Sequence, residues 1–179
     1  MIWKFFKKAK TAIILIFWGK LIYARSIGVK IGCNCRIYTT VWGTEPFLIT
    51  LGNNVTVTSG VKFITHDGSA CLAKDEKGRR YLYSPINVAN NVFIGIDSII
   101  MPGVRIGDNV VVGAGSVVTK SIPEGSVVAG VPAVIIGKFD KLKDKMLREY
   151  VSEKEINWTL SYKDRILQVT SWEFKQFLS

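Results

Sequence analysis

The chain has 179 residues, 48% of them hydrophobic, and this length suits one domain with at most a short appendage. The formal net charge is +10, and it is concentrated in residues 1–44, which carry eight Lys or Arg side chains before the first acid, Glu45. This basic front end suits an anionic membrane surface or an anionic substrate, while nucleic acid is disfavoured because the bases alternate with apolar residues and no nucleic-acid-binding motif is present.

Residues 1–24 predict an amphipathic N-terminal helix, with aromatic side chains available for burial at Trp3, Phe5, Phe6, Trp18 and Tyr23. The apolar stretch 11–19 ends at Lys20, so it is too short to span a bilayer, and no small-residue cleavage site marks a signal peptide. Two interpretations stay open. The helix packs on its own domain or a neighbouring subunit, or it contacts the cytoplasmic face of a membrane through its lysines and aromatic residues.

Three cysteines, an odd number without a secretory signal, occur at Cys33, Cys35 and Cys71. This pattern favours free thiols in a reducing compartment. We therefore expect a cytoplasmic protein, at the inner face of the membrane if the N-terminal helix binds lipid.

An internal repeat dominates the middle of the chain. Residues 88–129 divide into seven hexads: VANNVF, IGIDSI, IMPGVR, IGDNVV, VGAGSV, VTKSIP and EGSVVA. Related hexads begin at Arg25 and at Leu51, and the frame slips across residues 43–50 and again after His66. A period of six with an aliphatic first position predicts a solenoid in which each hexad is a strand plus a turn and three hexads complete one coil.

This repeat sets the expected organisation of the chain. Residues 25–137 would form the solenoid, with Gly, Asn and Asp at its corners, and residues 1–24 would cap one end. Residues 67–85 contain a polar run unsuited to stacking, so they are expected to leave the solenoid as a loop. Residues 138–179 would form a C-terminal helical segment, with a capping box in "SEKE" and a last short helix beginning at Ser171.

The segment "IGIDSIIMPGVRIGDNVVVGAGSVVTKSIPEGSVVAGVPAVII" resembles the hexapeptide-repeat acyltransferases. The resemblance implies a mainly β fold, a left-handed parallel β-helix, assembled as a homotrimer with acetyl-coenzyme A bound between subunits. The run "YARSIGVKIGCNCRIYTTVWGTEPFLITLGNNVTVTSGVKFITHDG" is similar to the branch that O-acetylates bacterial surface polysaccharides such as capsule, O-antigen or exopolysaccharide. An N-acetyltransferase acting on an amino sugar, a longer acyl donor and a non-catalytic scaffold docking at the membrane stay open.

His66 is the only histidine, and it stands at a coil edge beside the expected loop. An acceptor hydroxyl or amine must lose a proton as it attacks a thioester, and histidine is the side chain best suited to accept one near neutral pH. The resemblance accordingly implies that His66 is the general base. A zinc site would need three copies of this histidine at a trimer axis, so no metal is expected.

The resemblance also implies contacts with the two substrates. Positions that match coenzyme-binding sites are Ile96, Ala114, Thr119 and Lys120, with Lys138 standing in for an arginine that the family often carries after "GVPA". Aromatic and basic groups suit sugars, and the candidates for contact with a sugar acceptor are Asp67, Trp42, Arg79, Arg80, Tyr81 and Phe93.

Overall fold

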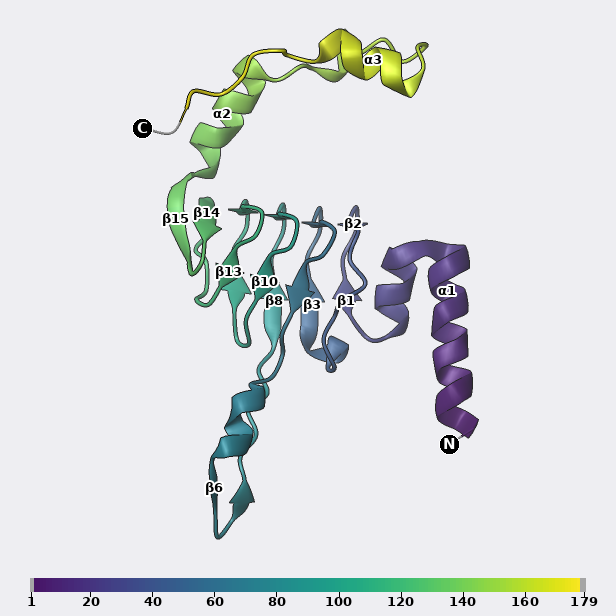
Figure 1. The fold of residues 1–179 in the computed structure, drawn as a ribbon, viewed down its shortest axis with the longest axis vertical. Coiled ribbons are helices and arrows are strands. Elements are labelled where there is room, and N and C mark those ends of the chain that lie inside the picture. The colour runs from purple at the N-terminus through teal and green to yellow at the C-terminus, as the bar shows by residue number, and fades with distance from the viewer. Residues whose placement is uncertain (1, 178–179) are drawn as a thin grey trace. The chain divides into compact units, whose positions relative to one another are not determined.

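Short parallel strands build three sheets in this computed structural model, which describes residues 2–177 and side chains from residue 13 onward (Figure 1). The first sheet holds β1 (Lys30–Ile31), β3 (Ile49–Leu51), β8 (Ile86–Val88) and β11 (Arg105–Ile106). The second holds β2 (Arg36–Ile37), β4 (Thr56–Val57), β9 (Phe93–Ile94), β12 (Val111–Val112) and β14 (Ser126–Gly130). The third holds β5 (Lys62–Phe63), β10 (Ile99–Ile100) and β13 (Val117–Val118).

The chain visits these sheets in a fixed cyclic order, and we call one pass through them a rung. The first rung covers residues 30–48, the second 49–85, the third 86–104 and the fourth 105–121. Within the second sheet Ile94 lies in register with Val57 on one side and Val112 on the other, and all three pair in parallel. Ile94 and Val112 are three hexads apart in the sequence, so the predicted parallel stacking of equivalent hexad positions is confirmed.

Most of the buried side chains between the sheets are aliphatic. Ile94 is fully buried, and Phe63, Ile100 and Val118 line the third sheet with at most 1% exposure. Full burial of one such side chain stabilises the fold by about 1.5–3 kcal/mol. A single rung buries few of these groups, so the stack of rungs supplies the core.

The second, third and fourth rungs turn at three corners, which we number after the sheet that the chain is leaving, whereas the first rung has no strand in the third sheet. At the first corner Asn54, Asn91 and Asn109 have positive φ angles of 55°, 56° and 55°, which confirms the turns predicted there. Their side chains form a ladder: Asn54 donates to Asn91 at 3.0 Å, and Asn91 donates to Asn109 at 3.3 Å. The second corner holds residues 58–61, 95–98 and 113–116, and the third holds 43–48, 64–85, 101–104 and 119–121.

The N-terminal helix α1 (Ile2–Ser26) is interrupted at Gly19, which has a non-helical φ of 79°. After Gly19 the helix packs on the first rung, where Ala24 is fully buried and Arg25 donates to the carbonyls of Ile31 and Gly32. The side chains of Trp3, Phe5 and Phe6, which the sequence offers for burial, lie outside those described. Within the described part of the chain, we find no helix with the length and apolar character needed to cross a membrane.

An insertion leaves the stack at the third corner of the second rung (Figure 1). It contains the 3-10 helix η2 (Gly68–Leu72) and an antiparallel hairpin of β6 (Lys74–Asp75) and β7 (Gly78–Arg79). Its two ends pair with each other, because Asp67 N donates to Leu82 O and Ser84 N donates to Thr65 O. Strands on either side of the insertion still pair in parallel, so the hairpin leaves the stacking intact.

Parallel stacking ends at β15 (Ala133–Lys138), which pairs antiparallel with β14. Residues 140–179 form a separate compact unit, whose elements are α2 (Phe139–Glu149), η3 (Glu153–Glu155) and α3 (Tyr162–Val169). The Glu155 carboxylate accepts from the backbone N–H of Ser152, as in a capping box, and from the Ser152 hydroxyl, at the start of a short 3-10 turn. The prediction of a helix beginning at Ser171 is wrong, because residues 171–177 carry no regular secondary structure. The Ser171 hydroxyl only accepts a hydrogen bond from Glu173 N.

Candidate active site

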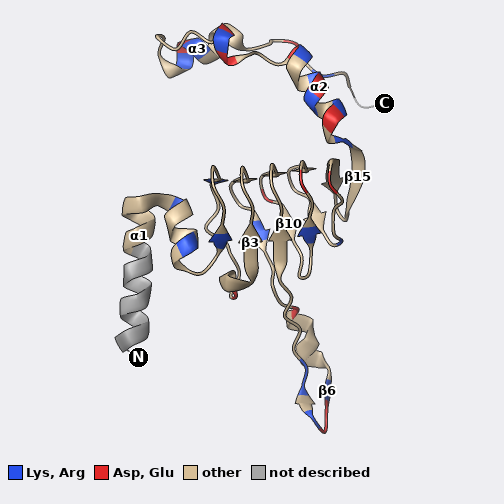
Figure 2. Ribbon diagram, turned by 180° about the vertical axis from the view of Figure 1, so that it is seen from behind, with Lys and Arg blue, Asp and Glu red and all other residues tan. Residues whose placement is uncertain are grey.

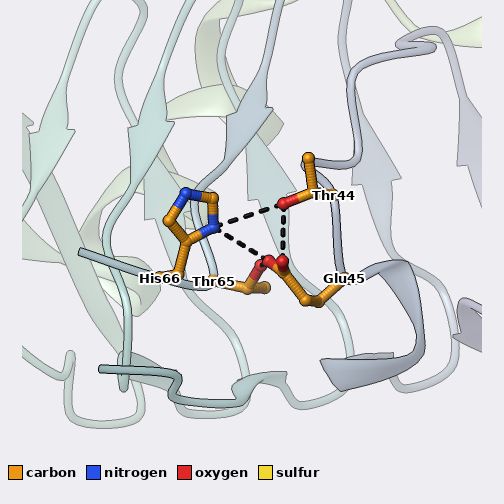
Figure 3. A network of polar contacts seen from close by, with 4 residues as sticks. All are labelled: Thr44, Glu45, Thr65 and His66. Carbon is orange, nitrogen blue, oxygen red and sulfur yellow. Dashed lines mark hydrogen bonds and ion pairs between the residues drawn. The ribbon is translucent and has the colours of Figure 1, made fainter. Parts of the chain in front are cut away.

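His66 lies at the third corner, three residues after β5, and the first rung places Thr44 and Glu45 at the same corner beside it (Figure 3). Close contact between the two rungs explains this placement. Trp42 stacks on Phe63 with ring centroids 5.1 Å apart and planes 5° from parallel. Gly43 follows, where a Cβ would stand 2.8 Å from the Phe63 carbonyl oxygen, so only glycine allows the backbones to approach this closely.

Glu45 is the centre of a polar network. Its Oε2 lies 2.9 Å from His66 Nδ1 and accepts a 2.5 Å hydrogen bond from the Thr65 hydroxyl, while its Oε1 accepts from the Thr44 hydroxyl at 2.6 Å. Hydrogen bonds from Thr44 and Thr65, and then the contact with His66, lower the pKa of the Glu45 carboxyl from 4.5 to about 2. The carboxylate is therefore ionised throughout the neutral range.

An ionised carboxylate only accepts hydrogen bonds, so the contact with Glu45 fixes the hydrogen of neutral His66 on Nδ1. The unprotonated Nε2 is then left as the acceptor, on a side chain that is 40% exposed. A carboxylate behind one imidazole nitrogen and an open position at the other is the arrangement of an oriented general base. The Glu45 carboxylate is the component that the sequence reasoning missed.

A hollow of about 420 Å³ adjoins His66. It is lined by side chains of three rungs and of the insertion: Ile64, His66, Asp67, Leu82, Met101, Pro102 and Thr119. The Asp67 carboxylate accepts from the hydroxyl and the backbone N–H of Ser69, the hydroxyl being the larger cause of its lowered pKa. Asp67 therefore caps η2 while also bordering the hollow.

The predicted coenzyme-contacting residues divide between two corners. Thr119 also lines a second hollow of about 360 Å³, together with Lys120. Ile96 and Ala114 instead line an apolar groove of about 540 Å³ at the second corner, where Phe93 and Tyr38 join them. Lys138 lies exposed on β15 and lines none of these three spaces. Within one chain, Thr119 therefore borders the same hollow as His66, whereas Ile96 and Ala114 lie at the second corner.

The predicted acceptor residues also separate. Trp42 is 2% exposed and belongs to the core, so the prediction that it contacts an acceptor is wrong: its large ring packs on Phe63 instead of facing a groove. Arg79 lies over the ring of Tyr81, and Arg80 pairs with Asp75 on the hairpin. Among the described residues, no three His, Cys, Asp or Glu side chains gather as they would around a metal ion.

Comparison with known proteins places the chain in a family. Residues 85–120 match the model of the bacterial transferase hexapeptide (six repeats). Protein CapG of Staphylococcus aureus is 45% identical over 137 residues, which cover 75% of this chain and 80% of that protein. The chain belongs to the bacterial hexapeptide transferases. The family predicted from the sequence is therefore confirmed.

Two further proteins that are similar to this chain are named as O-acetyltransferases. Galactoside O-acetyltransferase of Escherichia coli (strain K12) is 35% identical over 129 residues, covering 72% of this chain and 63% of that enzyme. The crystal structure of a maltose O-acetyltransferase from Clostridium difficile 630 superposes with a TM-score of 0.53 at 28% identity, covering 74% of this chain and 84% of that one. The chain is thus similar in sequence to one protein named as a sugar O-acetyltransferase, and in fold to another.

Proposed function

We propose that this protein transfers an acetyl group from acetyl-coenzyme A to a hydroxyl of a sugar in a bacterial surface polysaccharide. The observation that carries the proposal is the Glu45–His66 pair, with Nε2 of the imidazole open beside a hollow. Relatives named as sugar O-acetyltransferases support the donor and the acceptor class.

The geometry supports direct transfer. His66 Nε2 accepts the proton of the acceptor hydroxyl while its oxygen attacks the thioester carbonyl and forms the new C–O bond. The C–S bond then breaks, and the imidazolium returns the proton to the leaving sulfur, so the products are the ester and coenzyme A. Glu45 stabilises the imidazolium, and the hydroxyls of Thr44 and Thr65 hold the carboxylate in place.

The same proposal extends to assembly. The three sheets form the sides of a left-handed parallel β-helix, and three copies associate as a homotrimer. The division of the predicted residues supports this assembly, since His66 stands at the third corner whereas Ile96 and Ala114 stand at the second. In a ring of three copies, the second corner of one protomer can face the third corner of the next and complete each site.

We place the protein in the cytoplasm, with α1 against the inner face of the membrane. Four large apolar side chains of α1 are between 49% and 74% exposed: Ile13, Ile16, Phe17 and Trp18. The preceding residues supply Lys4, Lys7, Lys8 and Lys10. Apolar and basic side chains in one helix suit the headgroup region of an anionic bilayer.

The test of the activity is His66→Ala. Wild type incubated with acetyl-coenzyme A and a panel of nucleotide sugars and lipid-linked oligosaccharides, amino sugars included, is expected to give an acetylated product by mass spectrometry. His66→Ala is expected to lose about 10³-fold in turnover, as removal of a general base does. Its melting temperature should hold, because the side chain lies at a rim outside the buried core. Wild-type turnover in His66→Ala would overturn the proposal.

The shared site is tested by complementation. Ala114→Trp would fill the groove of the second corner, and His66→Ala removes the base at the third. Each variant alone is expected to be inactive. In mixed trimers about a quarter of the sites would combine two intact corners, so co-expression of the two variants should recover about a quarter of wild-type activity. No recovery in trimers shown to contain both variants would exclude a site between subunits.

A further inference from the structure

The hairpin carries a row of side chains that leads away from His66. Tyr83 lies directly opposite His66 in the antiparallel pairing at the base of the insertion. Residues opposite each other in such a pair, and every second residue along an extended strand, project to the same face. Tyr83, Tyr81 and Arg79 therefore form one row, which begins at the imidazole.

The contacts between these side chains agree with this alignment. The Tyr83 ring centroid lies 6.0 Å from the His66 ring, and the Tyr81 ring stacks on Tyr83 at 6.3 Å with planes 7° from parallel. The Arg79 guanidinium lies 4.8 Å above the centre of the Tyr81 ring. The row thus joins the base to a cation through two aligned aromatic faces.

The row is not part of the core of this chain. Tyr81 is 63% exposed and Tyr83 is 55% exposed. Among the described residues no carboxylate lies within ion-pair distance of Arg79, whereas the neighbouring Arg80 is already paired with Asp75. Figure 2 shows side chains of both charges on the hairpin, so the hairpin is not simply basic. The difference between the two arginines is that Arg80 is paired with Asp75.

We propose that this row binds the acceptor, and that the acceptor is an acidic saccharide carrying a carboxylate. Its sugar rings pack against the exposed parts of the Tyr83 and Tyr81 side chains, its carboxylate pairs with Arg79, and the hydroxyl to be acetylated reaches His66. The inference rests on the proposed function, since it assigns the substrate class of that same site.

The chemistry of the side chains favours this occupant. The apolar C–H faces of a pyranose pack well on aromatic rings, which combine a large apolar area with little loss of rotamer entropy. A planar guanidinium presents paired donors to a carboxylate, and its stacking on Tyr81 holds it in one orientation. A neutral saccharide could use only the rings, so Arg79 is the residue that would select an acid.

The experiment measures binding by calorimetry, with trigalacturonic acid and its neutral, carboxyl-reduced counterpart as probes on the full chain. Wild type is expected to bind the acid about fivefold more tightly, as for a partly exposed ion pair. Arg79→Gln should abolish this preference, and the matched Arg80→Gln should keep it. Tyr83→Leu, which leaves the contact between Arg79 and Tyr81 in place, should weaken binding of both saccharides about fivefold while preserving the ratio.

Equal affinity of wild type for the two saccharides, binding of neither, or an equal loss of preference in Arg79→Gln and Arg80→Gln would each overturn the inference. The proposed function fails by a different readout, namely undiminished acetyl transfer in His66→Ala. That variant should still prefer the acid, because the row remains in place without the imidazole.

Discussion

Replacing Glu45 by glutamine tests the orienting carboxylate directly. The amide keeps the shape of the side chain and one oxygen facing His66 Nδ1, but it removes the negative charge 2.9 Å from that nitrogen. Hydrogen bonds to charged groups are worth about 1.5–3 kcal/mol, and a loss of about 2 kcal/mol in the transition state corresponds to about a 30-fold lower rate. We expect kcat to fall by about that factor, with the KM for acetyl-coenzyme A nearly unchanged.

The assay follows release of coenzyme A with a thiol reagent, for both single variants and the double variant. If Glu45 acts through His66, adding Glu45→Gln to His66→Ala should cost no further activity. Glu149→Gln, which neutralises an exposed carboxylate of α2, is the matched control and should behave as wild type. An unaltered kcat in Glu45→Gln, or a full 30-fold loss on top of His66→Ala, would refute the positioning role.

Four further predictions concern stability and binding. The pKa of the Glu45 carboxyl is lowered to about 2 by folding, so its stabilisation is fully present above pH 4.5 and is lost as the pH falls toward 2. In urea titrations wild type should exceed Glu45→Gln by about 1–2 kcal/mol at pH 6, after screening is allowed for, and a constant difference down to pH 2 would contradict this. Ile94→Ala should cost about 3 kcal/mol of unfolding free energy because the side chain is fully buried. By contrast Ile96 is half exposed in the groove, so Ile96→Ala should leave stability unchanged but raise the KM for acetyl-coenzyme A about fivefold. An unchanged KM with a loss of stability would show that acetyl-coenzyme A does not bind in this groove. Vesicles rich in phosphatidylglycerol should retain wild type but not a variant with Phe17→Glu and Trp18→Glu, while phosphatidylcholine vesicles retain neither; equal retention of both proteins would count against membrane contact.

The sequence predicted the features that repeat. An aliphatic first position in six of the seven hexads led to the buried columns around Ile94, and Asn at the corners led to the positive φ angles of Asn54 and Asn91. Both follow from local chemistry recurring at a fixed spacing, which a sequence displays directly.

Features that depend on the meeting of two rungs were not predicted. Glu45 precedes His66 by 21 residues, inside a frame slip, and no local pattern connects them. The available signal was that Glu45 is the first acid of the chain, at the point where the repeat is interrupted. Trp42 was misassigned for a related reason: an aromatic residue beside a slip suits a groove as well as a core, and only the stacked Phe63 decides between them. Ser171 shows that a capping residue alone does not start a helix.

The stacking of rungs at the third corner also fixes the distance between side chains on neighbouring rungs. Parallel strands hold successive rungs at the separation fixed by their hydrogen bonds, about 4.8 Å, and this separation lets a side chain on one rung reach a neighbour on the next. Glu45 and His66 use one such step. The asparagine ladder of the first corner uses the same step, from Asn54 to Asn91 and from Asn91 to Asn109, so one spacing serves both a structural ladder and a pair suited to catalysis.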